Sequence, residues 1–466
     1  MRHFDLVIIG SGSGNSILDD RFADWNVAIV EKGVGSTGNY GGTCLNVGCI
    51  PTKMFVHTAD VAAAPAAGAA LGVDLQLSGV RWQEIRDRIF GRIDEISTGG
   101  RRYRAEDNPN VALIEGTGRF TDVKQLTVET AEGSETITGD RFVVAAGGRP
   151  AIPDIPGIES VGYHTSDSAM RLEELPRRMT ILGTGFVGAE FAHVFSSLGV
   201  EVTLVGRSER ILRSEDVDVS RRFTELADRR WDLRLNRKQV GVERDGDVTL
   251  LHLEGPDGPE TVAGEVLLVA TGRVPNADLL DAAAGGLAIG EGGKIKVDAT
   301  QLTSVDGVWA LGDISSDHEL KHVANHEMRV VQHNLLNPGS PIESDHQYVP
   351  HAVFSAPQIA SVGLTEQEAQ ERGIAYVTST QDYAGIAYGW AMEDHSGFAK
   401  LLADPATGRL LGAHVIGPQA PTLIQPLIQA MQFGLDARTM ARGQYWIHPG
   451  MPELVENALL NLPLGA

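Results

Sequence analysis

The sequence predicts an α/β fold that contains two related βαβ units and a third, smaller region. Leu6 to Ile9 form an apolar run that is typical of a buried parallel strand, and a glycine-rich loop follows directly. The same order of apolar run and glycine-rich loop recurs from Arg178 to Gly188. A chain of 466 residues is long enough for about three domains, each with its own core.

The first glycine-rich loop, Gly10-Ser-Gly12-Ser-Gly14-Asn15, lies between a strand and a helix that we expect from Ser16 onward. Such glycines let backbone amides approach a pyrophosphate at the N-terminus of a helix. The second strand of the unit, Val27 to Val30, ends at Glu31, and an acid at this point binds ribose hydroxyls. The motif predicts a dinucleotide site, although other βαβ units with a glycine turn share the pattern. Asn15 replaces the third glycine, which either loosens the packing of helix on strand or places an amide in the site.

The second glycine-rich loop, Gly183-Thr-Gly185-Phe186-Val187-Gly188, also follows a strand and opens a helix. The next strand, Val200 to Val205, ends in Gly206-Arg207 instead of an acid, and Arg213 lies six residues further on. An acid at this point favours the free 2′-hydroxyl of NAD, whereas arginine accommodates the 2′-phosphate of NADP. The two arginines therefore favour NADPH over NADH, and the alternative is that they are solvated surface charges.

The chain has two cysteines, Cys44 and Cys49, which lie between a double glycine and a proline. A structural zinc site needs four ligands, and the closure of so short a ring by a disulfide stabilises a fold little. The pair therefore indicates thiols that open and close as a reversible disulfide, with a structural disulfide as the weaker alternative.

Composition restricts the class of protein. The net charge of −22 argues against binding to nucleic acid or to an anionic membrane surface. No apolar stretch approaches the length that spans a membrane, and a strand begins almost at the N-terminus, so we expect neither an anchor nor a secretory leader. The expected setting is a reducing cytoplasm, where a disulfide is more often catalytic than structural.

Three further motifs complete a pattern that resembles the pyridine nucleotide-disulfide oxidoreductases. They are Ala270-Thr-Gly272-Arg273-Val-Pro-Asn276, Gly307-Val-Trp-Ala-Leu-Gly312-Asp313 and His448-Pro449-Gly-Met-Pro-Glu453, in the family's order and approximate spacing. The resemblance covers nearly the whole chain. It implies two Rossmann-like dinucleotide-binding domains, one inserted in the other, and a C-terminal α+β dimerisation domain. FAD would occupy the first nucleotide site and NADPH the second.

The resemblance also implies domain boundaries. We expect an FAD-binding domain formed by residues 1–149 and 273–346, an NADPH-binding domain over 150–272 and a dimerisation domain over 347–466. The proline-rich stretch Ile152-Pro-Asp-Ile-Pro-Gly157 marks the passage from the first domain to the second. Asp122 to Ile137 and Gly246 to Val262 are predicted to form hairpins or meanders set into the nucleotide folds.

The same resemblance assigns catalytic roles. Cys49 would lie against the flavin, and Cys44 would be the interchange thiol that attacks a substrate disulfide. A helix that begins near Cys49 would lower the pKa of a thiol through its dipole. Lys53, one turn further on, would pair with Glu190 beside the flavin. His448 and Glu453 would protonate the leaving thiolate from the partner subunit of a homodimer.

The remaining cofactor contacts follow from the motifs and the resemblance. The predicted cofactor-binding residues are Gly10, Gly12, Gly14, Asn15, Glu31, Lys32, Gly42, Thr43, Gly118, Ala146, Gly147, Gly183, Gly185, Phe186, Val187, Gly188, Arg207, Arg213, Gly272, Arg273, Gly312 and Asp313.

Several alternatives compete with these interpretations. His318, His322 and His326 recur at the spacing of metal ligands on a helix, but they follow the flavin motif directly, and we expect no metal site. A lysine at position 53 could extend into solvent, and His448 could belong to an ordinary loop. A dihydrolipoamide dehydrogenase, or a flavin-binding redox sensor without turnover, are the alternatives to a reductase of small disulfides.

The substrate is the least determined part of the prediction. Within the family, the absence of further cysteines favours reductases of glutathione disulfide, trypanothione or mycothione. Glutathione reductases carry an arginine on the helix after the first glycine loop, whereas this chain has Asp20 at about that point. A carboxylate would repel the carboxylates of glutathione disulfide but accept hydroxyls of the sugar-containing mycothione. The sequence therefore favours mycothione.

Overall fold

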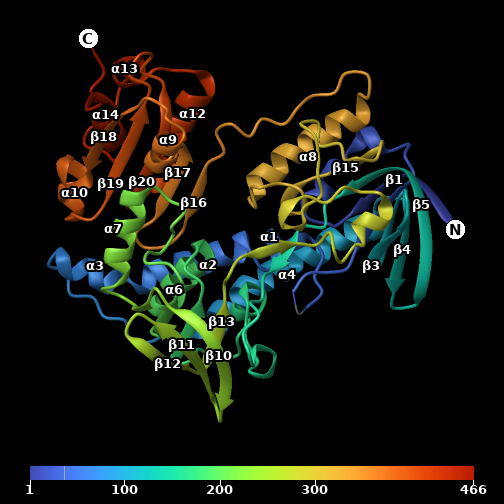
Figure 1. The fold of residues 1–466 in the computed structure, drawn as a ribbon, viewed down its shortest axis with the longest axis horizontal. Coiled ribbons are helices and arrows are strands. Elements are labelled where there is room, and N and C mark those ends of the chain that lie inside the picture. The colour runs from blue at the N-terminus through green and yellow to red at the C-terminus, as the bar shows by residue number, and fades with distance from the viewer. Residues whose placement is uncertain (36, 466) are drawn as a thin grey trace.

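The computed structural model describes residues 1–35 and 37–465, and it shows three groups of sheets and helices (Figure 1). Strands β1 (Arg2–Ile9) to β5 (Gly133–Val144) and β15 (Val308–Ala310) lie on the right of Figure 1, whereas α2 (Cys49–Ala62) and α3 (Ala64–Ala70) extend to the left. Residues between β6 (Gly148–Pro150) and β14 (Arg273–Pro275) form the lower part of Figure 1, and the C-terminal residues form the upper left part. None of the described helices is both long and apolar enough to cross a membrane.

A six-stranded sheet carries the first glycine-rich loop. Its parallel strands are β15, β5, β1, β2 and β3, and the antiparallel β4 joins the long ends of β3 and β5. The strand bounds are Arg2–Ile9 for β1, Val27–Glu31 for β2, Val111–Asp122 for β3, Gln125–Thr130 for β4, Gly133–Val144 for β5 and Val308–Ala310 for β15. The predicted strands at the N-terminus and the meander over 122–137 are present.

A four-stranded parallel sheet carries the second glycine-rich loop, in the order β13, β7, β8 and β9. These strands are Val266–Val269, Arg178–Leu182, Glu201–Val205 and Asp232–Arg234, and the predicted meander consists of β10 (Lys238–Asp245), β11 (Val248–Gly255) and β12 (Gly258–Gly264). The chain enters and leaves this part through β6 (Gly148–Pro150) and β14 (Arg273–Pro275), which pair antiparallel. Because these two short strands adjoin, the chain returns to the first sheet near the point where it left it.

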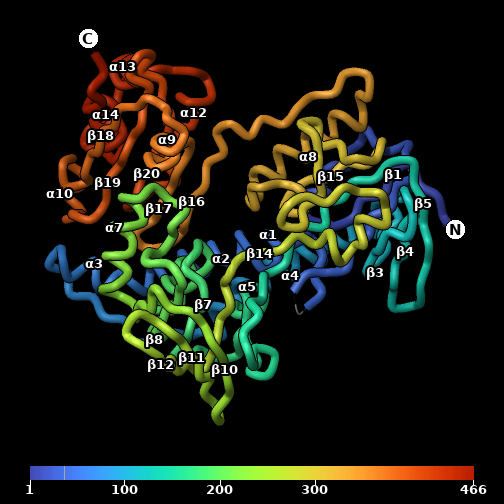
Figure 2. The backbone as a smooth tube through the Cα atoms, viewed as in Figure 1, coloured from blue at the N-terminus to red at the C-terminus, as the bar shows by residue number. Residues whose placement is uncertain are grey.

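The C-terminal part contains a five-stranded antiparallel sheet in the order β16, β17, β20, β19 and β18. Its strands are His351–Val353, Ile359–Gly363, Leu410–Ile416, Phe398–Ala403 and Val377–Asp382. Its helices include α9 (Glu366–Glu371), α12 (Gln425–Phe433), α13 (Ala437–Arg442) and α14 (Glu453–Leu460). Figure 2 shows how the segment after α8 (Lys321–Leu336) crosses the molecule to reach β16.

The helices α1, α2, α4 and α6 position the predicted redox site. α1 (Gly42–Asn46) and α2 (Cys49–Ala62) follow the first βαβ unit, and α2 packs on α6 (Phe186–Ser197) and on the long α4 (Trp82–Glu106). The buried face of α2 includes Phe55 and Val56, which join a core that also contains Phe191 and Phe195 of α6. Burial of such side chains stabilises a fold by about 1.5–3 kcal/mol each, so the two helices are held firmly together.

The prediction of a helix from Ser16 onward is wrong. The structure has only short 3₁₀ turns there, η1 (Gly14–Ile17) and η2 (Asp20–Phe22). Side chains from other elements replace the backbone N–H donors of a helix. Arg104 donates to the carbonyls of Asn15 (2.9 Å) and Leu18 (3.3 Å), and Gln332 donates to the carbonyl of Ile17 (2.7 Å). Because these carbonyls are already hydrogen-bonded, the segment does not need to continue as an α-helix.

Candidate active site

Two glycine-containing segments meet at the end of the first sheet. A Cβ on Gly42 would lie 2.6 Å from the Cα of Gly12, and one on Gly10 would lie 2.4 Å from the carbonyl oxygen of Ala145. Gly10 and Gly42 also have φ values of 101° and 75°, a region that favours glycine. Only glycine therefore allows the first loop and the N-terminus of α1 to approach each other, and the approach leaves backbone amides of both segments along one cavity wall.

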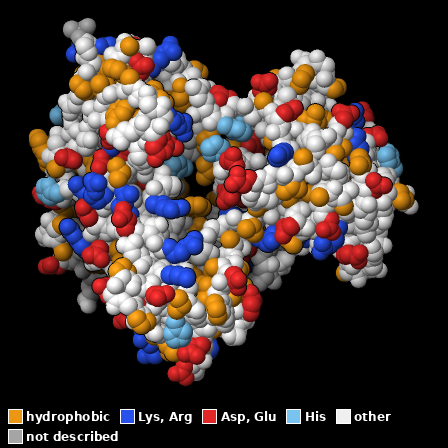
Figure 3. All heavy atoms as spheres, viewed as in Figure 1, with side chains coloured by type: hydrophobic (Ala, Val, Ile, Leu, Met, Phe, Trp, Pro, Cys, Tyr) orange, Lys and Arg blue, Asp and Glu red, His pale blue; other side chains and the backbone are white. Residues whose placement is uncertain are grey.

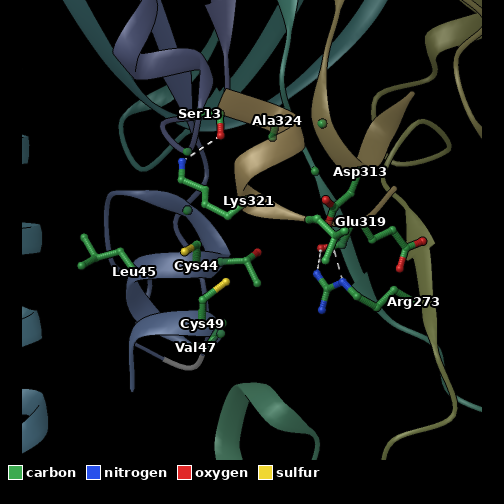
Figure 4. A pocket seen from close by; sticks show the side chains of 18 of the residues that line it. Ser13, Cys44, Leu45, Val47, Cys49, Arg273, Asp313, Glu319, Lys321 and Ala324 are labelled. Atoms are coloured by element: carbon green, nitrogen blue, oxygen red, sulfur yellow. Dashed lines mark hydrogen bonds and ion pairs between the residues drawn. The ribbon is translucent and has the colours of Figure 1, made fainter. Parts of the chain in front are cut away.

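The two cysteines lie at adjacent helix ends beside this wall. Cys44 is half-buried in α1, Cys49 is exposed at the first position of α2, and both line a cavity of about 1350 Å³. Figure 4 shows them facing the start of α8 and Asp313 across this cavity. The pKa of Cys44 is lowered to about 7, first because the Cys49 thiol donates a hydrogen bond to it and further because of the charge of Lys321. Cys44 is thus the sulfur that carries negative charge in the dithiol, as an attacking thiol requires.

Lys53 and Glu190 reach the same cavity from α2 and α6, but they do not form the direct ion pair that we expected. Both contact Phe354 instead. The Nζ atom of Lys53 lies 4.0 Å from the centre of the Phe354 ring, and the backbone N–H of Phe354 donates to Glu190 Oε1 at 2.9 Å. An ammonium over an aromatic ring is attracted by the ring's negative face, so the Phe354 ring partly replaces the Glu190 carboxylate as the partner of Lys53.

Glu190 has a strongly perturbed pKa. Burial raises it to about 7, and the hydrogen bond from Phe354 and the charge of Lys53 oppose the rise only in part. Burial also lowers the pKa of Lys53. A carboxyl group and an amine that both titrate closer to neutrality are typical of a site where charge changes during a reaction.

This pKa predicts a pH effect on stability. Because the pKa of Glu190 in the folded protein lies above its ordinary value of 4.5, the folded chain binds more protons than the unfolded chain between about pH 4.5 and 7. The wild type should therefore lose stability relative to Glu190→Gln as the pH rises through this interval. Urea unfolding of both proteins at pH 5 and pH 8 measures the difference, and parallel pH profiles would contradict the buried, protonated carboxyl.

The first nucleotide site fits FAD. Glu31 ends β2 in the cavity wall, where its carboxylate accepts the backbone N–H groups of Ser11 (2.6 Å) and Gly33 (2.7 Å). Asn15 does not loosen the packing: its Oδ1 accepts hydrogen bonds from Tyr40 Oη (2.9 Å) and from the buried Arg104 (2.8 Å). The glycine that close packing requires is Gly14, where a Cβ would lie 2.7 Å from the Cβ of Ala145.

The second nucleotide site has the same construction. A Cβ on Gly183 would lie 2.1 Å from the carbonyl oxygen of Ala270, and one on Gly188 would lie 2.1 Å from that of Gly183. Arg207 and Arg213 are both exposed after β8. Leu212 is buried with its N–H bonded to the carbonyl of Thr184 at 2.9 Å, which fixes the segment that carries Arg213 against the second glycine-rich loop. In Figure 3, basic side chains gather on the lower part of the molecule beside the central hollow.

His448 and Glu453 form the predicted pair. His448 Nδ1 lies 2.7 Å from Glu453 Oε1, and the other oxygen of Glu453 accepts the N–H of Gly450 at 3.2 Å. The hydrogen bond with His448 lowers the pKa of Glu453. The side chain of His448 is 70% exposed, and neither residue lines the cavity of Cys44 and Cys49 in the same chain.

The cavity gathers most of the predicted residues from both nucleotide sites and the redox site. Those that line it are Gly10, Gly12, Asn15, Glu31, Lys32, Gly42, Thr43, Cys44, Cys49, Lys53, Gly118, Ala146, Gly147, Gly185, Phe186, Val187, Glu190, Arg273, Gly312 and Asp313. Those that lie outside its lining are Gly14, Gly183, Gly188, Arg207, Arg213, Gly272, His448 and Glu453.

The histidine run has ordinary contacts. His318 precedes α8 and lies against His346, with ring centres 5.7 Å apart. His322 Nε2 lies 2.8 Å from the carbonyl oxygen of Pro350, and His326 Nε2 accepts the N–H of Asp345 at 3.2 Å. Within residues 1–35 and 37–465, no three His, Cys, Asp or Glu side chains are arranged to hold a metal ion.

Comparison with known proteins identifies the family. A family model described as pyridine nucleotide-disulphide oxidoreductase matches residues 4–330, and the model of that family's dimerisation domain matches residues 349–459. The chain belongs to the pyridine nucleotide-disulphide oxidoreductases. This confirms the resemblance and the fold class inferred from the sequence, and it makes the chain an oxidoreductase that uses FAD and a pyridine nucleotide.

The similar proteins cover the whole length of the chain. A mycothione reductase of Mycobacterium tuberculosis (strain H37Rv) is 52% identical over 469 residues, which cover 99% of this chain and 100% of the relative. The probable pyridine nucleotide-disulfide oxidoreductase RclA of Escherichia coli is 31% identical over 97% of this chain and 98% of its own. A solved structure of this HOCl-induced flavoprotein disulfide reductase superposes with a TM-score of 0.85 and 29% identity, covering 98% of this chain and 99% of that one.

Two residues of the site were not predicted. Phe354 lies about 300 residues from Lys53 in the sequence, and no local pattern indicates that the two meet. Lys321 is the first residue of α8 and lines the cavity with Cys44. Its signal in the sequence was a cation at the start of a helix that follows the flavin motif, because a positive charge is unfavourable at a helix N-terminus.

Proposed function

We propose that the protein is an NADPH-dependent reductase of mycothione. The observation that carries the proposal is the 52% identity to a mycothione reductase over the full length of both chains. The dithiol beside a FAD-sized cavity supports the reaction class, and Arg207 and Arg213 after β8 support NADPH. The domain boundaries given above and a cytoplasmic location are part of this proposal.

Bound FAD supplies the transfer of electrons from NADPH to the Cys44–Cys49 disulfide. The glycines of the two loops would hold the cofactors, with Glu31 on a ribose and Asp313 on the chain that links the flavin to its phosphates. Lys53 would place positive charge beside the flavin. Glu190 would hold this lysine indirectly, because both residues contact Phe354.

The chain's own residues would then reduce the substrate. The Cys44 thiolate attacks one sulfur of the disulfide, forms a mixed disulfide and displaces a thiolate. His448 of the second subunit in a homodimer gives that thiolate a proton from Nε2, since Nδ1 is held by Glu453. Cys49 next attacks Cys44, which releases the second product thiol and restores the disulfide for another cycle.

The substrate depends on the surface around Cys44. Asp19 accepts hydrogen bonds from Arg21 (2.6 Å) and Gln332 (3.1 Å), and Asp20 is exposed in η2. Neither aspartate lines the cavity of the single chain, so the contact of Asp20 with substrate remains a prediction for the dimer.

The proposal is tested by comparing disulfides. With NADPH and FAD-loaded enzyme, kcat/KM for mycothione should exceed that for glutathione disulfide by about tenfold or more, because Asp20 would repel the glutathione carboxylates instead of pairing with them. Asp20→Arg should raise the value for glutathione disulfide and lower that for mycothione, whereas Asp24→Arg, an exposed aspartate outside the cavity, is the matched control. Equal use of both disulfides by the wild type would contradict the substrate but not the reaction class.

A further inference from the structure

Lys321 is a cation that the proposed mechanism does not use. It is the first residue of α8, and its Nζ donates to Ser13 Oγ of the first glycine-rich loop at 2.8 Å. Ser13 in turn lies 3.4 Å from Oδ1 of Asn325, one turn further along α8. The lysine is thus tied to the cavity wall by a residue of another element, and Figure 4 shows its side chain above Cys44.

The surroundings of Cys44 give this cation a target. Lys321 of α8 and Asp313 of η6 (Gly312–Ile314) both line the cavity of Cys44, and the charge of Lys321 lowers the pKa of this thiol. Asp313 acts against the thiolate, while Arg273 lies 3.6 Å from Asp313 and offsets its charge. The ammonium of Lys53 lies over the ring of Phe354 instead.

The chemistry of an ammonium group fits this place. It has three N–H donors, of which Ser13 accepts one, so donors remain for a sulfur or for a polar group of the substrate. A positive charge at the N-terminus of a helix is unfavourable for the helix itself. Ser13 therefore holds in position a charge that α8 alone would disfavour.

We propose that Lys321 is an electrostatic partner of the interchange thiol, placed by Ser13 so that its ammonium stabilises the Cys44 thiolate. The inference rests on the proposed role of Cys44 as the attacking sulfur. In the attack, the thiolate's electron pair forms the bond to a substrate sulfur, the substrate S–S bond breaks, and the charge leaves with the displaced thiolate. Lys321 thus sets the fraction of Cys44 that is ready to react at neutral pH.

The test isolates one sulfur. In Cys49→Ser protein, Cys44 is the single cysteine of the chain. A serine hydroxyl is itself a hydrogen-bond donor, so the substitution keeps a donor at position 49. The rate of alkylation by iodoacetamide is measured from pH 5 to 10 in FAD-loaded protein with Lys321, Lys321→Met, Lys321→Gln or Lys321→Arg. Loss of the Lys321 charge should raise the midpoint of the curve of alkylation rate against pH by about one pH unit, which lowers the alkylation rate at pH 7 about fivefold. Lys321→Arg should stay near the parent.

The controls separate this role from structural ones. Lys294 pairs with Asp317 at 3.1 Å in the same region, so Lys294→Met should leave the midpoint unchanged. Flavin absorbance per chain reports FAD retention for each variant. An unchanged midpoint in Lys321→Met and Lys321→Gln overturns the proposal, and loss of FAD with an unchanged midpoint assigns the lysine to the cofactor instead. Because alkylation needs no disulfide, an incorrect substrate assignment would leave this result intact.

Discussion

Cys44→Ser is expected to abolish disulfide reduction, with kcat/KM falling on the order of 10⁴-fold or more. A serine hydroxyl is hardly ionised near neutral pH, whereas the pKa of the Cys44 thiol is lowered to about 7 by its hydrogen bond from Cys49 and by Lys321. Cys49→Ser should lose turnover to a similar extent, because the mixed disulfide on Cys44 can no longer be resolved from within the chain. Steady-state oxidation of NADPH with disulfide substrate measures both.

A spectroscopic difference separates the two sulfurs. FAD-loaded Cys44→Ser should absorb at long wavelength without any reductant, because Cys49 then remains as a thiolate beside the flavin. Cys49→Ser should lack this band although it binds the same amount of FAD. The reverse pattern would exchange the roles of the two cysteines.

His448→Ala is expected to slow disulfide reduction about a hundredfold or more, the usual scale for a general acid–base group. The imidazole is held through Nδ1 by Glu453 at 2.7 Å, which leaves Nε2 for the leaving thiolate. Reduction of the flavin by NADPH should be unaffected, because this half-reaction displaces no substrate thiolate that His448 would protonate. Stopped-flow reduction of the flavin and steady-state turnover distinguish the two steps.

Mixed dimers show whether the histidine acts across subunits. Dimers of one Cys44→Ser and one His448→Ala chain contain one intact combination of cysteine and histidine if each site draws on both chains. They should then recover up to about half of the wild-type activity, and dimers that carry both changes in one chain provide the matched control. No recovery in verified mixed dimers would contradict a site shared between subunits.

Much of the active site was predictable from local patterns. The spacing of Cys44 and Cys49 and the recurrence of the glycine-rich loop imply a redox pair and two nucleotide sites, because each motif acts through the backbone or side chains of a short stretch. The helix from Ser16 was not predictable in the same way. This prediction fails because Arg104 and Gln332, which lie far along the chain, donate hydrogen bonds to backbone carbonyls of this segment.

The sequence by itself determined the family, the two nucleotide-binding units and the residues that carry charge and sulfur. Only the tertiary structure decided how these charges are matched, because partners in space are not neighbours in sequence. It placed Phe354 in contact with both Lys53 and Glu190, and it buried Glu190, which raises the pKa of this carboxyl group. It also brought Lys321 to Ser13 and to the cavity of Cys44, because α8 returns to the first glycine-rich loop after about 300 residues.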